Sequence, residues 1–200
     1  MSAIRRRHFL QFAGLAASSA LLPASVRGAV RTPPQWSTLV EKAEAAMDQY
    51  SVKLRDRFVV VDFSMPSAAA RMLLVDRESG KHRLLHVAHG RGSDPAHSGF
   101  VRSFSNVPGS LASSRGAYLT GPHYSGQHGP SQRLIGLEPS NNNAESRAIV
   151  IHGAWYSNDD MVKRLGKLGR SEGCFAVSEA QINPLLEWLG PGRMLYADKV

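Results

Sequence analysis

The sequence holds a single cysteine, Cys174, in 200 residues. One thiol excludes an internal disulfide, and a free thiol in an oxidising compartment is open to oxidation. The chain also lacks an apolar run suited to a stable membrane span, an internal repeat and, beyond its N-terminus, any dense run of basic residues. These absences argue against a disulfide-stapled scaffold, a membrane-spanning domain and a nucleic-acid-binding protein.

Acidic residues are absent from residues 5–29, which begin with three arginines and continue with small and apolar residues. This pattern predicts a cleaved signal peptide over residues 1–28, and the twin arginine followed by x-Phe-Leu at 6–10 favours twin-arginine export. An ordinary secretory signal is the alternative. Removal of residues 1–28 takes away four arginines and no acid, so the formal charge falls from +8 to +4. A mild positive surplus suits an anionic cell wall or membrane surface.

Hydrophobic periodicity predicts a linker and N-terminal helix over residues 29–57, followed by one domain over 58–200 that is mostly β. Helices are also expected over 157–168 and from Ser178, where Ser-x-x-Gln resembles a capping box, as "STLVE" resembles an N-terminal cap at the first helix. Strands are expected at 58–64, in a hairpin over 71–90, at 116–121 and 132–138 around a Gly-rich turn, at 147–153, and at the C-terminal "RMLYAD".

The longest segment without a strand or helix pattern covers residues 91–115, where Gly, Pro and small polar residues dominate. A loop of this length in a compact domain is typical of a binding loop or a lid.

The surroundings of Cys174 favour reactivity over burial as a small hydrophobe, because Ser171, Glu172 and Gly173 make a poor wall for an apolar pocket. A free thiol has a pKa of about 8.5, so a nucleophilic cysteine needs a base or a positive environment that lowers this pKa. His152 ends a predicted strand, and one short helix separates it from Cys174, so the chain can bring imidazole and thiol together. Arg170 and the backbone amides near Gly173 add positive potential.

The stretch "IVIHGAWY" followed by "GRSEGCFAVS" resembles the His-Gly … Ser-x-Gly-Cys signature of the L,D-transpeptidase (YkuD-type) catalytic family, and the likeness extends over residues 58–198. The resemblance implies a mixed β-sandwich or barrel-like α+β domain with two or three flanking helices. It implies that Cys174 is the nucleophile and His152 the general base, with Ser171 and Gly173 orienting the pair and forming the oxyanion hole. It further implies peptidoglycan as the substrate and no metal or organic cofactor.

Two residues depart from the family pattern. Glu172 stands where the family usually has a second histidine, and Ala176 stands where it usually has an arginine. Arg147 and Arg170 are the candidates to order the site in place of that arginine. Because an inward carboxylate would raise the thiol pKa, we expect Glu172 to point outwards.

Other residues have two interpretations. Tyr124 and His128 either line the substrate cleft or belong only to a turn, and Trp155 and Tyr156, which follow His152, either form a cleft wall that buttresses the imidazole or are core. A metal site at His86, His89 and His97 is disfavoured, because residues i and i+3 of a strand point to opposite faces. A non-catalytic cell-wall binding protein and a cysteine hydrolase of another exported amide remain alternative functions.

Overall fold

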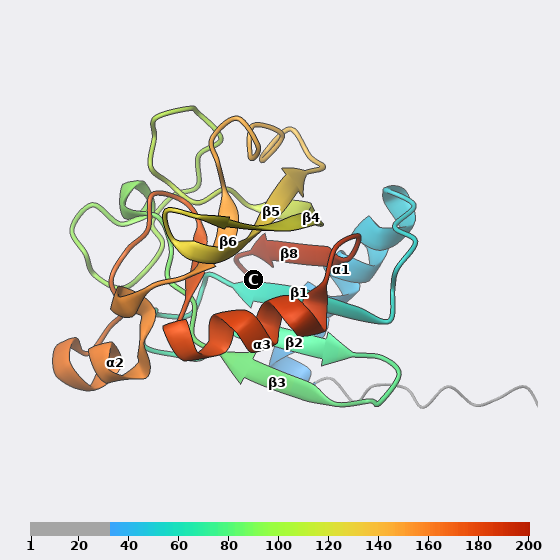
Figure 1. The fold of residues 1–200 in the computed structure, drawn as a ribbon, viewed down its shortest axis with the longest axis horizontal. Helices are drawn as coiled ribbons and strands as arrows, with labels where there is room; N and C mark the ends of the chain where they lie inside the picture. Colours follow the sequence, from blue (N-terminus) through green and yellow to red (C-terminus); the bar gives the residue numbers. More distant parts are fainter. Residues whose placement is uncertain (1–32) are drawn as a thin grey trace, which may run out of the picture.

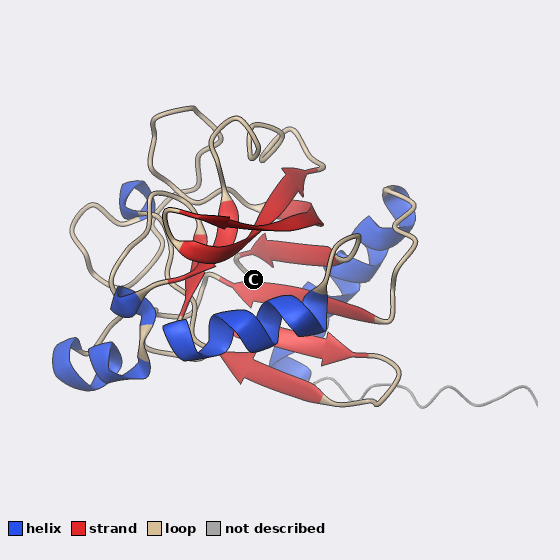
Figure 2. Ribbon diagram, in the orientation of Figure 1, coloured by secondary structure: helices blue, strands red, loops and turns tan. Residues whose placement is uncertain are grey.

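The computed structural model describes residues 33–200, so the predicted signal peptide lies outside the described residues. Within that range eight strands form one sheet in the order β3-β2-β1-β8-β4-β5-β6-β7 (Figures 1 and 2). The strands are β1 (Arg57–Asp62), β2 (Met72–Asp76), β3 (His82–Leu85), β4 (Gly116–Gly126), β5 (Gly129–Gly136), β6 (Val150–Gly153), β7 (Phe175–Val177) and β8 (Met194–Asp198). The predicted class is confirmed: the domain is mostly β, barrel-like and flanked by three α-helices, α1 (Ser37–Gln49), α2 (Asp159–Leu165) and α3 (Glu179–Leu189).

The sheet closes on itself through a short segment that follows β3. We call residues 86–91 the seam segment. It leaves β3 at one edge of the sheet and reaches β7 at the other, where Ala88 bridges Ala176 in antiparallel fashion and Gly90 bridges Ser171. Because these bridges cover the open edge of β7, the sheet is nearly a closed barrel.

Alternation along the strands divides the apolar side chains between two main cores. Val59 and Val61 of β1 face a core that is filled by one face of α3. Phe58 and Val60 face the opposite side, where they pack against α1. Helices α1 and α3 therefore cover opposite faces of the sheet (Figure 1). None of the helices within residues 33–200 is both long and apolar enough to cross a membrane.

Helix α1 is shorter than the periodicity predicted, because it ends at Gln49 in a Schellman-type turn. Ser51 adopts a left-handed φ of 51° and donates its amide to the Asp48 carbonyl, while the Val52 amide bonds to the Met47 carbonyl at 3.0 Å. Val52 and Met47 are both buried in the core beneath α1. The chain after Gln49 therefore turns, and Val52 returns to the core in place of further helix.

The predicted side-chain caps of α1 and α3 are wrong. Trp36 occupies the N-cap of α1, and the Ser37 hydroxyl donates instead to the Pro34 carbonyl at 2.8 Å. Ser178 is the N-cap of α3 but makes no capping hydrogen bond with its side chain. The Glu179 amide donates to Asn158 Oδ1 at 2.9 Å, so a residue from the start of α2 caps α3.

The hairpin of β4 and β5 is longer than predicted. Pairing continues through Tyr124↔Ser131 to Gly126↔Gly129, so the "PHYSGQHGPS" segment is mostly strand and only Gln127 and His128 form its tip. Neither Gln127 nor His128 has a positive φ, and Gly129 after them has a φ of 71°, the pattern of a turn followed by a left-handed residue, which glycine tolerates. His128 therefore lies at the tip of a paired hairpin, and not in a loose turn between two short strands.

Candidate active site

The pairing of β6 with β7 places His152 and Cys174 on the same face of the sheet. The two strands are parallel, with Ile151 opposite Phe175 and His152 opposite Ala176. Ile151 and Phe175 belong to the core under α3, so His152 and Ala176 point the other way. Cys174 precedes Ala176 by two residues and shares its direction. A diagonal pair of this kind has Cα atoms roughly 8 Å apart.

In the resting structure the thiol and the imidazole each contact a backbone carbonyl. Cys174 Sγ donates to the Ala148 carbonyl at 3.5 Å, and His152 Nδ1 lies 2.9 Å from the Gly153 carbonyl. The carbonyl fixes the proton on Nδ1, which leaves Nε2 with its lone pair for a proton acceptor role. Proton transfer from Cys174 to His152 therefore requires the thiol to turn away from the Ala148 carbonyl.

The pKa of the Cys174 thiol differs from the sequence-based expectation. Burial raises this pKa and Glu172 adds to the rise, while the Val150 amide and Arg147 lower it. The thiol is therefore protonated at neutral pH, because the low polarity around the sulfur outweighs the nearby positive charge. Burial also lowers the pKa of His152, and the charge of His128 acts in the same direction, against the Gly153 carbonyl. The site thus pairs a neutral thiol with a neutral imidazole that is free to accept its proton.

A tight turn carries Cys174. The Ser171 hydroxyl donates to the Cys174 carbonyl at 2.7 Å and accepts the Gly173 amide at 3.2 Å. Gly173 has a φ of 120°, and a Cβ there would lie 2.8 Å from the Ala112 carbonyl oxygen. The Gly173 amide donates to Ser171, whereas the amides of Val150 and Cys174 both lower the thiol pKa.

Arg147 holds the long loop, residues 91–115, at the site. Its guanidinium donates to the carbonyls of Ser105 (2.7 Å) and Ala112 (2.5 Å) and to the hydroxyl of Ser114 (2.6 Å). Cys174 lies close enough to raise the pKa of Arg147, although burial makes the net shift downward. A cation is therefore present beside the sulfur even though position 176 holds alanine.

Arg170 and Glu172 are turned away from the sulfur. The Arg170 guanidinium donates to the backbone carbonyls of Asp94 and Pro95, so it also anchors the long loop. Glu172 is 68% exposed and pairs with Arg91 at 2.7 Å, which agrees with the expected outward direction.

The β4–β5 hairpin brings His128 onto His152. The two rings stack with centroids 4.4 Å apart and an interplanar angle of 24°. Tyr124, the other candidate from this hairpin, lies under the guanidinium of Arg133, 4.6 Å from its ring centroid. Of the two, His128 is the one that contacts the candidate base.

Tyr156, grouped with Trp155 in the sequence analysis, lies near the candidate nucleophile. Burial raises its hydroxyl pKa to about 12, with further contributions from Cys174 and Glu172, so the phenol lies near both. Trp155 is 64% exposed and packs edge-on against Tyr156.

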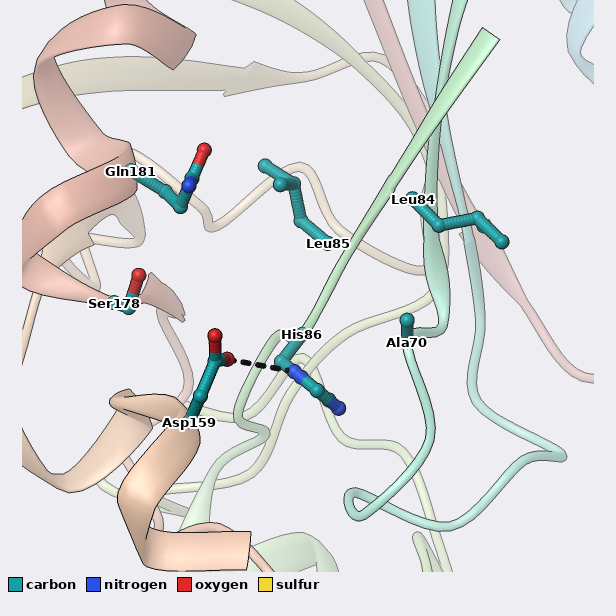
Figure 3. A pocket seen from close by; sticks show the side chains of 7 residues that line it. All are labelled: Ala70, Leu84, Leu85, His86, Asp159, Ser178 and Gln181. Atoms are coloured by element: carbon teal, nitrogen blue, oxygen red, sulfur yellow. Dashed lines mark hydrogen bonds and ion pairs between the residues drawn. The ribbon is translucent and has the colours of Figure 1, made fainter.

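The histidines considered as metal ligands have other partners. His86 lies between Asp159 Oδ1 (2.9 Å) and the Ala68 carbonyl (3.1 Å), at a pocket of ≈ 200 Å³ between β3 and the start of α3 (Figure 3). His97 Nε2 contacts the Leu168 carbonyl at 2.9 Å. Across residues 33–200 no group of three or more His, Cys, Asp or Glu residues is placed to hold a metal ion.

The L,D-transpeptidase catalytic domain family matches this chain over residues 35–197, and the chain belongs to that family. No curated protein matches it.

Among solved structures, the chain is similar to an L,D-transpeptidase from Mycobacterium smegmatis, with 14% identity and a TM-score of 0.42 over 72% of this chain and 58% of that one. It is similar to LD transpeptidase LdtMt1 in complex with imipenem, with 13% identity and a TM-score of 0.43 over 72% of this chain and 59% of that one. It is also similar to the Ldtfm-avibactam carbamoyl enzyme, with 13% identity and a TM-score of 0.39 over 74% and 50%. The chain thus spans between 50% and 59% of these solved chains.

Proposed function

We propose that this protein is an exported cysteine peptidyltransferase that acts on peptidoglycan stem peptides through a thioester on Cys174. The observation that carries the proposal is the common direction of His152 on β6 and of Cys174 just before the parallel strand β7, in a chain of the L,D-transpeptidase catalytic domain family. Export rests on the N-terminal sequence pattern of residues 1–28, and the positive charge left after its removal suits an anionic wall.

The proposed reaction has two transfers. His152 Nε2 accepts the thiol proton while Cys174 Sγ attacks the carbonyl of the L-centre in a tetrapeptide stem, and the proton then goes to the leaving amine of the terminal D-alanine. The resulting thioester is attacked by an amine of a second stem, which gives a 3→3 cross-link, or by water, which gives a trimmed tripeptide. Val150 and Cys174 amides, together with Arg147, stabilise negative charge near the sulfur.

Mass spectrometry of products from purified disaccharide tetrapeptide tests this function. We expect free D-alanine together with either a cross-linked dimer or a disaccharide tripeptide, since both acceptors consume the same thioester. A folded, pure protein that leaves the tetrapeptide intact would contradict the proposal. A second candidate is a non-catalytic wall-binding protein, which would retain muropeptide without releasing D-alanine. The observations that support it are the raised thiol pKa and the residues at positions 172 and 176.

His128 is expected to set the acid limb of the pH profile. Replacing it with alanine removes a neighbour that lowers the pKa of His152 and uncovers the ring, so the pKa of His152 should rise towards its ordinary value. The fraction of neutral His152 at mildly acidic pH then falls, and the acid limb of kcat/KM shifts to higher pH. The matched control is His123→Ala, an exposed histidine of the same hairpin. An unchanged acid limb in His128→Ala would contradict this role.

A further inference from the structure

Three buried polar side chains that the proposed reaction does not use meet at the seam segment, to which His89 belongs. Arg71, His89 and Asp94 each have 0% exposure. Arg71 Nη2 contacts His89 Nδ1 at 2.6 Å, and His89 Nε2 lies 3.4 Å from Asp94 Oδ2. Because a guanidinium only donates, Nδ1 is the acceptor and the ring proton sits on Nε2, directed at the carboxylate. A neutral imidazole thus joins a buried cation to a buried anion.

The two ends of this triad are fastened to the backbone of different segments. Arg71 donates to the carbonyls of Val87 (3.1 and 3.0 Å) and Met65 (2.9 Å). Asp94 accepts the amides of Ser98 and Gly99, each at 2.8 Å. Removing one member would leave a buried charge without its partner, so the triad favours a single arrangement of these segments.

His89 is neutral in this setting. Burial lowers its pKa to about 4, and Arg71 and Arg170 act in the same direction, against the raising effect of Asp94. The ring edge also meets Phe63, with centroids 6.4 Å apart. Near pH 7 the imidazole therefore keeps one donor and one acceptor, which is what the contacts to Arg71 and Asp94 require.

The backbone around His89 holds the turn of Cys174 at both of its ends. The His89 carbonyl accepts the Ser171 amide at 2.9 Å, and the Arg91 amide donates to the Ser171 carbonyl at 2.8 Å. On the other side of the cysteine, the Ala88 amide donates to the Ala176 carbonyl at 2.8 Å. A shift of the seam segment would move residues 171 and 176 together, and with them the sulfur relative to His152.

We propose that His89, held between Arg71 and Asp94, is a positioning residue that fixes the seam segment and thereby the turn that presents Cys174 to His152. This proposal rests on the peptidyltransferase function proposed above. A positioning role affects the chemical step more than substrate binding, because the sulfur and the imidazole must meet at hydrogen-bond distance.

The test is His89→Phe, which keeps an aromatic ring but removes both hydrogen bonds. We expect kcat for D-alanine release to fall at least about ten-fold with KM nearly unchanged, as a small misplacement at a reacting centre produces. The pH profile of Cys174 alkylation by iodoacetamide should also change: burial raises the thiol pKa in the wild type, and a displaced turn exposes the sulfur, so alkylation of the variant begins at lower pH. His89→Asn, whose Oδ1 can still accept from Arg71, is expected to lose less.

The matched control is Met47→Ala, a fully buried residue in the separate core under α1. It should lower stability without changing the alkylation profile. A wild-type kcat and profile in His89→Phe, or equal changes in Met47→Ala, would overturn the positioning role. If His89→Phe is insoluble, Asp94→Asn is measured in the same way with the same expectations. Alkylation needs no muropeptide, so it still reports on positioning if wild type releases no D-alanine and the proposed function fails.

Discussion

Cys174→Ala is expected to reduce D-alanine release from disaccharide tetrapeptide by at least about a thousand-fold, because loss of a catalytic nucleophile removes most of the rate enhancement. The sulfur is the atom that would form the thioester, and no second thiol exists in the chain to replace it. The half-buried Cys174 side chain is small, so alanine should fit without disturbing β7. The measurement is the rate of D-alanine release by mass spectrometry, with the fold checked by circular dichroism.

A matched variant separates the loss of chemistry from the loss of packing. Ser113→Ala removes a buried hydroxyl that accepts the Gly90 amide at 2.9 Å, close to the same turn, but leaves the sulfur in place. We expect Ser113→Ala to retain far more activity than Cys174→Ala. Alkylation of its Cys174 should also give the same mass increase as in the wild type. Undiminished turnover in Cys174→Ala would reject the nucleophile assignment.

Gly173→Ala is expected to have the second largest effect, on both stability and turnover. The φ of 120° is strained for any residue with a Cβ, and that Cβ would lie 2.7 Å from Ile149 Cδ1 and 2.8 Å from the Ala112 carbonyl. The carbonyl belongs to the loop that Arg147 fastens, so it cannot yield cheaply. Strain of about 1–3 kcal/mol plus the contact should lower the melting temperature by about 5 °C or more. Turnover should fall at least about ten-fold, since the turn carries the sulfur.

Gly80→Ala is the control that isolates backbone strain from crowding. Gly80 has a φ of 68° in the hairpin between β2 and β3, and a Cβ there meets nothing within 4 Å. We expect a loss of about 1 kcal/mol in stability and wild-type turnover. Comparable turnover losses in the two variants would show that the crowding at Ala112 is irrelevant.

The parts of the fold that follow from local pattern could be predicted from the sequence. Continuous β-branched residues in "FVVVD" specify a strand buried on both sides, and "ESGK" specifies the turn of the β2–β3 hairpin. The end of α1 escaped prediction because Ser51 adopts a conformation usually left to glycine. The cap of α3 escaped prediction because the Ser178 side chain makes no capping hydrogen bond, while Asn158, twenty-one residues before Glu179, accepts the first amide of the helix.

In the candidate site, too, some features follow from the sequence and others only from the tertiary structure. By itself the sequence determined the residue types that could do the chemistry, namely one thiol, a strand-end imidazole and a glycine before the cysteine, since nucleophile chemistry depends on the kind of group present. Only the tertiary structure decided their surroundings: the parallel register of β6 with β7, the stacking of His128 on His152, the loop held by Arg147 and the triad behind the seam segment. These contacts join residues distant in the chain, and burial at those contacts sets the pKa values of the thiol and the imidazole, which no local pattern encodes.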